Sequence, residues 1–222
     1  MATRIDSDVI ISGDLQSTTM TLPASCVSNS QVSSTAAIDR SKLAQDSNKP
    51  YAIRLSDFRV WDSVATVLPG TAGSDDLAFD EGTWGTNPSY ITTGDIKTTS
   101  STRYARVLIP IPAEYVDAET VTLRLSCGMQ TTVADGSCTI DAVVYENTGA
   151  SATGISADLC ATAAQSMNSL TAANKDFVIT STDLVAGDVL DVRIAIAYVD
   201  TATVGAVIGN IYKAQLLVDV KG

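Results

Sequence analysis

Apolar and polar residues alternate along most of residues 51–222, whereas residues 1–50 carry only scattered single apolar residues. Successive side chains of a β-strand point to opposite faces, so this alternation predicts strands with one buried face. Turn sequences such as Ala134-Asp135-Gly136 and Ala186-Gly187-Asp188 separate the runs. The pattern predicts about eight strands and no sustained helix. The clearest alternating runs are residues 51–60, 105–111, 121–127, 138–145, 177–180, 190–198 and 212–220.

Two stretches are less regular. Residues 69–102 are polar and contain glycines, and we expect only short, irregular strands there. Residues 161–167 also fit the apolar face of a helix, but we interpret them as a strand.

We predict an all-β fold in which two antiparallel sheets form a sandwich. A jelly roll is our first choice for the topology. An immunoglobulin-type sandwich is the second choice, because the Cys, Trp, Cys arrangement typical of that fold is absent.

The first 50 residues have a different character. They contain 15 Ser/Thr and no aromatic residue. Short strands are predicted at residues 9–15 and 18–22, a weak helical turn at 34–43, and a polar linker at 45–50. Ordering a residue costs about 1–2 kcal/mol, which so few apolar side chains cannot recover among themselves.

We therefore divide the chain into an extended N-terminal arm, residues 1–50, and a β-sandwich domain, residues 51–222. The arm is expected to become ordered against a neighbouring domain, a sister subunit or a larger assembly, and disorder is the alternative. Its candidate contact residues are Val9, Ile11, Leu15, Met20, Leu22, Val27, Val32, Ile38 and Leu43.

The formal net charge is −11, and its distribution narrows the choice of partners. The arm has 4 Lys/Arg against 5 Asp/Glu, which leaves 10 against 20 for the remaining residues. Such an acidic surface repels phosphate backbones, so we expect no nucleic-acid partner. No run approaches the roughly 20 apolar residues of a membrane span, and the N-terminus lacks a secretory h-region. We expect a soluble protein made in a cytoplasm, with no membrane partner.

Four cysteines are present, and none forms a CxxC pair. Cys127 ends one alternating run and Cys138 begins the next, so both point into the core if these strands form a hairpin. Buried thiols are the expected state, and a disulfide between the two stays open. The acidic pairs Asp75-Asp76 and Asp80-Glu81 lack the spacing of a calcium loop and are interpreted as solvated loops. We predict no metal and no cofactor.

No histidine occurs in the chain, and this limits the chemistry available to it. Ser-His-Asp and Cys-His nucleophile systems and HExxH zinc sites are excluded. The sequence also lacks GxSxG, GxxxxGK[ST] and GxGxxG motifs. Carboxylate-only glycoside hydrolysis stays formally open, but we expect a protein that is not an enzyme.

Aromatic residues offer one candidate binding surface. Side chains of this kind stack on sugars when they are exposed, although they more often anchor cores or loops. Trp84 and Tyr90 are the candidate glycan contacts, and the other aromatic residues considered with them are Trp61, Tyr104 and Tyr115.

The arm also carries a resemblance. Its segments look like the short fibrous segments near the N-termini of fibre, spike and capsid-decoration proteins of tailed bacteriophages. The Ser/Thr-, Gly- and Ala-rich strand pattern that includes residues 186–190 looks like the jelly-roll heads of such proteins. The segments that carry the likeness are Thr19-Met20-Thr21-Leu22-Pro23, Val27, Asn29, Val32, Ala36-Ala37-Ile38 and Lys42-Leu43.

The resemblance implies a structural protein on the virion surface, assembled in the host cytoplasm. It implies a homotrimer whose arms dock on the major capsid protein or another virion protein while the heads face solvent. The first hypothesis is therefore a capsid decoration or cement protein. The alternative is a fibre or tail-associated adsorption module that binds host glycans.

Overall fold

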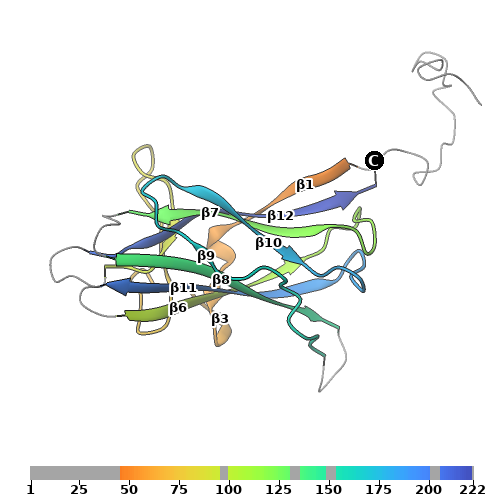
Figure 1. The fold of residues 1–222 in the computed structure, drawn as a ribbon, viewed down its shortest axis with the longest axis horizontal. Coiled ribbons are helices and arrows are strands. Elements are labelled where there is room, and N and C mark those ends of the chain that lie inside the picture. Colours follow the sequence, from red (N-terminus) through yellow and green to blue (C-terminus); the bar gives the residue numbers. More distant parts are fainter. Residues whose placement is uncertain (1–45, 96–99, 131–135, 149–153, 201–205, 222) are drawn as a thin grey trace, which may run out of the picture. The chain divides into compact units, whose positions relative to one another are not determined.

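The computed structural model describes residues 46–95, 100–130, 136–148, 154–200 and 206–221. Two antiparallel sheets lie face to face in this part of the chain (Figure 1). The all-β, two-sheet prediction is confirmed, while the finer choice of a jelly roll stays a prediction.

The first sheet has the order β10-β7-β12-β5-β4, and β1 also pairs with β12. The second has the order β3-β2-β6-β11-β8-β9. The strands of the first sheet are β1 (Asp46–Ile53), β4 (Ala78–Asp80), β5 (Tyr90–Thr92), β7 (Val121–Met129), β10 (Ala173–Ile179) and β12 (Gly209–Val220). The strands of the second sheet are β2 (Arg59–Val60), β3 (Ser63–Val67), β6 (Ser100–Pro110), β8 (Gly136–Asn147), β9 (Gln165–Ser166) and β11 (Val189–Asp200).

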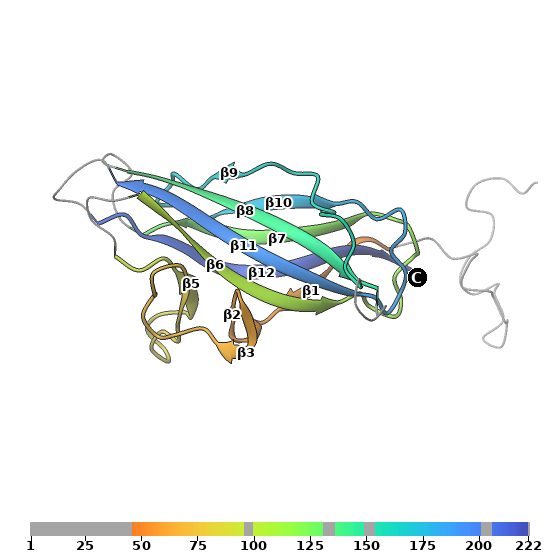
Figure 2. The same ribbon diagram turned by 90° about the horizontal axis from the view of Figure 1, so that it is seen from below.

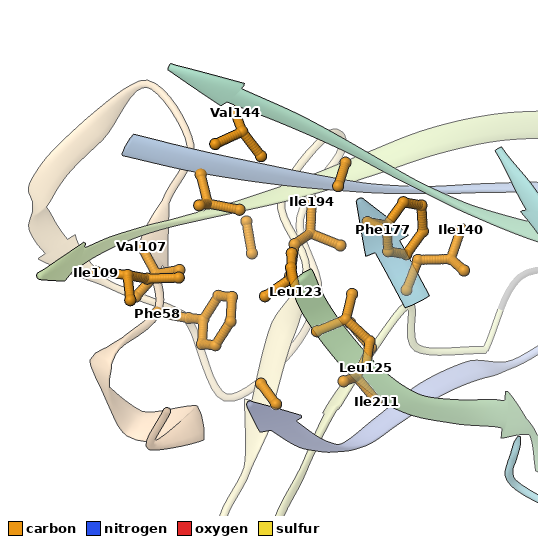
Figure 3. Close-up of a cluster of buried hydrophobic side chains, with 14 of the residues drawn as sticks. Phe58, Val107, Ile109, Leu123, Leu125, Ile140, Val144, Phe177, Ile194 and Ile211 are labelled. Carbon is orange, nitrogen blue, oxygen red and sulfur yellow. The ribbon is translucent and has the colours of Figure 1, made fainter. Parts of the chain in front are cut away.

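The core lies between the two sheets, where the alternation of the sequence places it. Every second residue of β11 from Leu190 to Tyr198 is buried, and β8 buries alternate residues in the same way. Side chains from both sheets meet in the gap, as Leu123 and Leu125 of β7 do with Ile194 of β11 (Figure 3). Burying each such aliphatic side chain contributes about 1.5–3 kcal/mol.

The hairpin considered for residues 121–145 does not form. Strand β7 lies between β10 and β12 in the first sheet, whereas β8 lies between β11 and β9 in the second. Cys127 and Cys138 therefore enter the core from opposite sheets, and both are free thiols. Burial raises the pKa of each thiol to about 12. The expectation of buried thiols is confirmed, but the pairing that motivated it is wrong.

The alternating run at residues 51–60 is also divided. Strand β1 ends at Ile53, and a 3₁₀ turn at Leu55–Asp57 follows, closed by an N–H of Phe58 that donates to the Leu55 carbonyl over 3.3 Å. The buried Phe58 ring enters the core at this turn, and β2 then pairs with β6 in the other sheet (Figure 3). Alternation alone does not reveal such a change of sheet, because it continues on both sides of the turn.

The start of the domain also differs from the prediction. Residues 46–50 belong to β1 and pair antiparallel with β12 instead of forming a linker. Asn48 adopts a positive φ of 58° within an irregularity of this pairing, a conformation that asparagine tolerates well.

Other predictions have mixed outcomes. Among the described residues of 69–102, only the short strands β4 and β5 precede β6, as expected. The strand interpretation of residues 161–167 is confirmed only for the two residues of β9. The predicted elements at residues 9–43 and all nine arm contact residues lie outside the described residues: Val9, Ile11, Leu15, Met20, Leu22, Val27, Val32, Ile38 and Leu43.

The two long edges of the sandwich are covered differently (Figure 2). On one side, residues 155–167, which we call the strap, run along the gap between β8 and β10. The Leu159 N–H donates to the Val144 carbonyl of β8 over 2.7 Å, and the Thr180 N–H donates to the Leu159 carbonyl over 2.8 Å. Leu159 also packs against the core, so one residue of the strap joins both sheets.

Candidate functional site

The candidate site is built on the hairpin formed by β4 and β5. Asp80 and Tyr90 are directly paired across this hairpin. One Asp80 carboxylate oxygen accepts from the Gly82 N–H over 2.8 Å, and the other accepts from the Tyr90 hydroxyl over 2.9 Å. The hydrogen bond to Asp80, followed by desolvation, raises the pKa of Tyr90. The carboxylate thus fixes both the start of the loop and the tyrosine behind it.

The loop between the two strands is held by its own backbone. The Thr83 N–H donates to the Asn87 carbonyl over 3.1 Å, and the Asn87 N–H donates to the Thr83 carbonyl over 2.9 Å. Gly82 has a φ of 68°, and a Cβ there would lie 2.4 Å from the Asn87 carbonyl oxygen. Glycine is therefore required at this position.

Trp84 lies in this loop and is fully exposed to solvent. It lines a shallow hollow of about 700 Å³ with Glu81, Thr86 and Pro88. A fully exposed tryptophan leaves a large apolar surface in water, and such side chains are typical of binding surfaces.

A second hollow of about 400 Å³ adjoins the first and shares Gly82, Asn87 and Pro88 with it. Tyr90 and Tyr212 of β12 line it, with ring centroids 6.0 Å apart and planes tilted by 54°. The structure thus brings Trp84 and Tyr90 to neighbouring hollows on one hairpin.

Amide groups complete the second hollow. The Asn210 side-chain nitrogen donates to the Gln130 side-chain oxygen Oε1 over 3.0 Å and to the Tyr212 hydroxyl oxygen over 3.2 Å. Because the Tyr212 oxygen accepts, its own proton stays available to another acceptor. The Asn210 side-chain oxygen is buried and has no hydrogen-bond partner among the described residues.

Sequence reasoning missed Gln130, Asn210 and Tyr212. In the sequence, Tyr212 is only the first residue of the alternating run at 212–220. The three residues lie far from Tyr90 in the sequence, and the pairing of β12 with β5 brings two of them beside it. No local sequence pattern indicates that these residues lie close to Tyr90.

The arrangement suits a ligand with many hydroxyl groups. Tyrosine and tryptophan rings offer flat surfaces to the C–H faces of a sugar, while amides and a carboxylate bind its hydroxyls. Asp80 retains acceptor capacity beyond its two bonds, because a carboxylate has about four lone-pair sites.

The other aromatic candidates lie elsewhere. Tyr115 is fully buried, and its hydroxyl donates to the Glu119 carbonyl over 2.6 Å. Trp61 contacts Tyr104 at a centroid distance of 5.4 Å, and its indole N–H donates to Asp75 over 3.2 Å. None of these three rings lines the two hollows.

The two acidic pairs, Asp75-Asp76 and Asp80-Glu81, also lie in different parts of the fold. Asp80 belongs to the hairpin site, whereas Asp76 lies beside the edge of β6. Desolvation, then the charges of Asp75 and Asp62, raises the pKa of Asp76. Within the described ranges no group of three or more His, Cys, Asp or Glu side chains is placed to hold a metal ion.

Comparison with known proteins adds no assignment. No protein-family model matches this sequence, and no curated protein matches it either. In the part of the chain that the structure describes, no helix has the length and apolar character needed to cross a membrane.

Proposed function

We propose that this chain is a structural protein of a tailed-phage particle, a decoration or cement protein that acts as a homotrimer. Its N-terminal arm binds the major capsid protein or a neighbouring virion protein, and the sandwich projects from the surface. The phage-like segments of the arm, including Thr19-Met20-Thr21-Leu22-Pro23, support this proposal by resemblance.

The structural observation that best supports the proposal is that the domain has its own core while the arm is a separate segment attached to β1. The described residues between 46 and 221 form a core built from both sheets, and its apolar side chains are buried without the arm. The arm precedes β1, which is hydrogen-bonded to β12 from Lys49 to Ile53 and so provides a firm attachment. Three such arms on one trimer would add weak contacts through effective concentration.

Removal of the arm tests this proposal. Because residues 46–50 belong to β1, the deletion should cover residues 2–45 and no more. We expect the truncated protein to keep the circular dichroism and cooperative unfolding of the full chain but to lose cosedimentation with phage particles. Undiminished binding to particles contradicts the proposal.

A second function is favoured by the hairpin site. Here the domain serves host adsorption, and the hollows beside Trp84 and Tyr212 bind a surface glycan. A fully exposed tryptophan next to a tyrosine- and amide-lined hollow is the observation that supports it.

Glycan-array binding by the full chain tests this alternative. We expect Trp84→Ala and Tyr212→Phe each to weaken binding at least tenfold, the latter by removing a single hydroxyl. Leu170→Ala is the matched control, because Leu170 is also a large exposed apolar residue but lines neither hollow. An array without binding, or equal effects of all three substitutions, removes the alternative.

A further inference from the structure

The second long edge of the sandwich contains a groove of about 530 Å³ between β1 and β6. Tyr51 to Ile53 form one wall, and residues 107–113 form the other. Leu216, a fully buried core residue of β12, contributes to its lining, so the groove reaches into the space between the sheets. Most of the lining side chains are apolar.

The wall formed by β6 offers unused backbone groups. Tyr104 exchanges hydrogen bonds with residues 75–77 on this edge, with distances of 2.8 and 2.9 Å. Backbone groups of alternate residues point to the same edge of a strand, so those of Arg106 and Leu108 point there as well. Arg106 pairs with Arg59 of β2, but no described strand pairs with Leu108 on this edge.

The opposite wall has the same property, because β1 pairs only with β12 among the described strands. Leu108 lines this wall and is 47% exposed, because it lies on the solvent face of β6 between the buried Val107 and Ile109. An apolar groove between two unpaired strand edges is a site for strand addition.

The strap on the other edge shows which kind of segment can fill a gap between the two sheets. There an extended segment hydrogen-bonds to both sheets, and Leu159 packs against the core. Figure 2 shows that segment beside β8 and β10, on the edge opposite to β2 and β3. The groove between β1 and β6 is the equivalent gap on the second edge, and no described segment fills it in the way that the strap fills the first.

We propose that the strand predicted at Thr18–Leu22 of the arm docks in this groove as an extended segment between β1 and β6. Met20 and Leu22 then face the core, and Thr19 and Thr21 face solvent. Pro23 ends the segment, since proline cannot donate to a strand ladder. The docked strand pairs with Leu108, and its solvent-facing threonines partly cover the Leu108 side chain.

The position and length of the arm favour this occupant. The arm leads directly into β1, which is itself a wall of the groove. Residues 23–45 separate Leu22 from β1 and span at most about 75 Å when extended, far more than the eight-residue strand β1 requires. The residues next to β1 are poorer candidates, because Asp39, Arg40 and Lys42 would bring charges into an apolar groove.

This inference does not depend on attachment to a virion. It concerns only where part of the arm is held, and the donor is either the same copy or a neighbouring copy.

Hydrogen exchange of the full-length protein tests the docking. We expect the Leu108 amide to be protected in the natural sequence and to exchange at least tenfold faster in Met20→Asp/Leu22→Asp. Thr19→Asp/Thr21→Asp is the matched control, with the same charge added to the solvent face, and it should preserve protection.

Three exchange results overturn the assignment. The first is free exchange of the Leu108 amide in the natural sequence, and the second is equal loss of protection in both double variants. The third is loss of protection in Val9→Asp/Ile11→Asp without loss in Met20→Asp/Leu22→Asp, which would assign the groove to residues 9–15 instead.

Oxidative cross-linking provides a second measurement, in a Cys26→Ser/Cys160→Ser background. Thr19→Cys combined with Leu108→Cys should form a disulfide faster than Met20→Cys combined with Leu108→Cys, because Leu108 lies on the solvent face of β6 between the buried Val107 and Ile109. A cross-linked product of monomer mass assigns the arm to its own sandwich, and one of oligomer mass assigns it to a neighbour's. Equal rates for the two pairs contradict docking. A protein that keeps Leu108 protected but fails to bind particles contradicts the proposed function and leaves the docked strand intact.

Discussion

The two long edges of this sandwich differ in how the gap between the two sheets is covered. Between β8 and β10 the strap supplies backbone hydrogen bonds to both sheets and a leucine to the core. Between β1 and β6 the described chain crosses from sheet to sheet at Phe58 and again near Leu77, and a groove is left beyond the first crossing. The edge between β8 and β10 is closed by residues within the domain, whereas the edge between β1 and β6 is covered by the arm in our proposal.

Substitution in the core beside the closed edge should have the largest effect on stability. Phe177 of β10 is fully buried, so Phe177→Ala should lower the free energy of unfolding by about 3–5 kcal/mol through lost burial and a cavity. Urea denaturation of the full chain measures this difference. Val178→Ala, one residue away and 49% exposed, is the control and should cost under about 1 kcal/mol. Similar costs for both would mean that β10 does not bury alternate residues.

A pair of leucine truncations compares the edges directly. Leu159→Ala in the strap should lower the free energy of unfolding by about 2 kcal/mol, because this side chain packs on the core. Leu108→Ala should cost about 1 kcal/mol or more if the arm covers it, and under about 0.5 kcal/mol if the groove stays open to water. The same urea measurement on both variants decides between these outcomes, and a small effect at Leu108 counts against the docked strand.

The smallest effect is expected for an ion pair near the closed edge. Two of the three Arg124 side-chain nitrogens, Nε and Nη2, donate to Asp176 over 2.7 and 2.6 Å, and this hydrogen bonding lowers the pKa of Asp176. Because the side chains are 33% and 42% exposed, solvent screening limits the pair to under about 1 kcal/mol.

The pH dependence of this pair has a definite sign. A carboxyl whose pKa is depressed in the folded state contributes stability above its unfolded pKa, here 3.8, and loses it as the pH falls through the lower folded value. The difference in unfolding free energy between the natural sequence and Asp176→Asn should therefore be present at pH 7 and shrink below about pH 4. Urea unfolding at a series of pH values checks this, and a difference that grows on acidification contradicts it.

Only some residues of the candidate site could be predicted from the sequence. Trp84 and Tyr90 stand out in the sequence because they are aromatic residues in a polar, glycine-containing stretch. Gln130, Asn210 and Tyr212 reach the same hollow only because β12 pairs with β5 on one side and β7 on the other. Their contribution depends on neighbours distant in the sequence, and no local pattern encodes those neighbours.

The amino-acid sequence by itself determined the long strands β6, β7, β8, β11 and β12, the buried face of each, and the burial of the Cys127 and Cys138 thiols. Alternation has this power because the side-chain period of a strand is two, and one face must leave water. Only the tertiary structure decided that β7 and β8 belong to different sheets, that the chain changes sheets at Phe58, and that one edge is strapped while the other is grooved. These choices depend on which strand edges meet across the core, and an alternating strand can bury the same face beside many different partners.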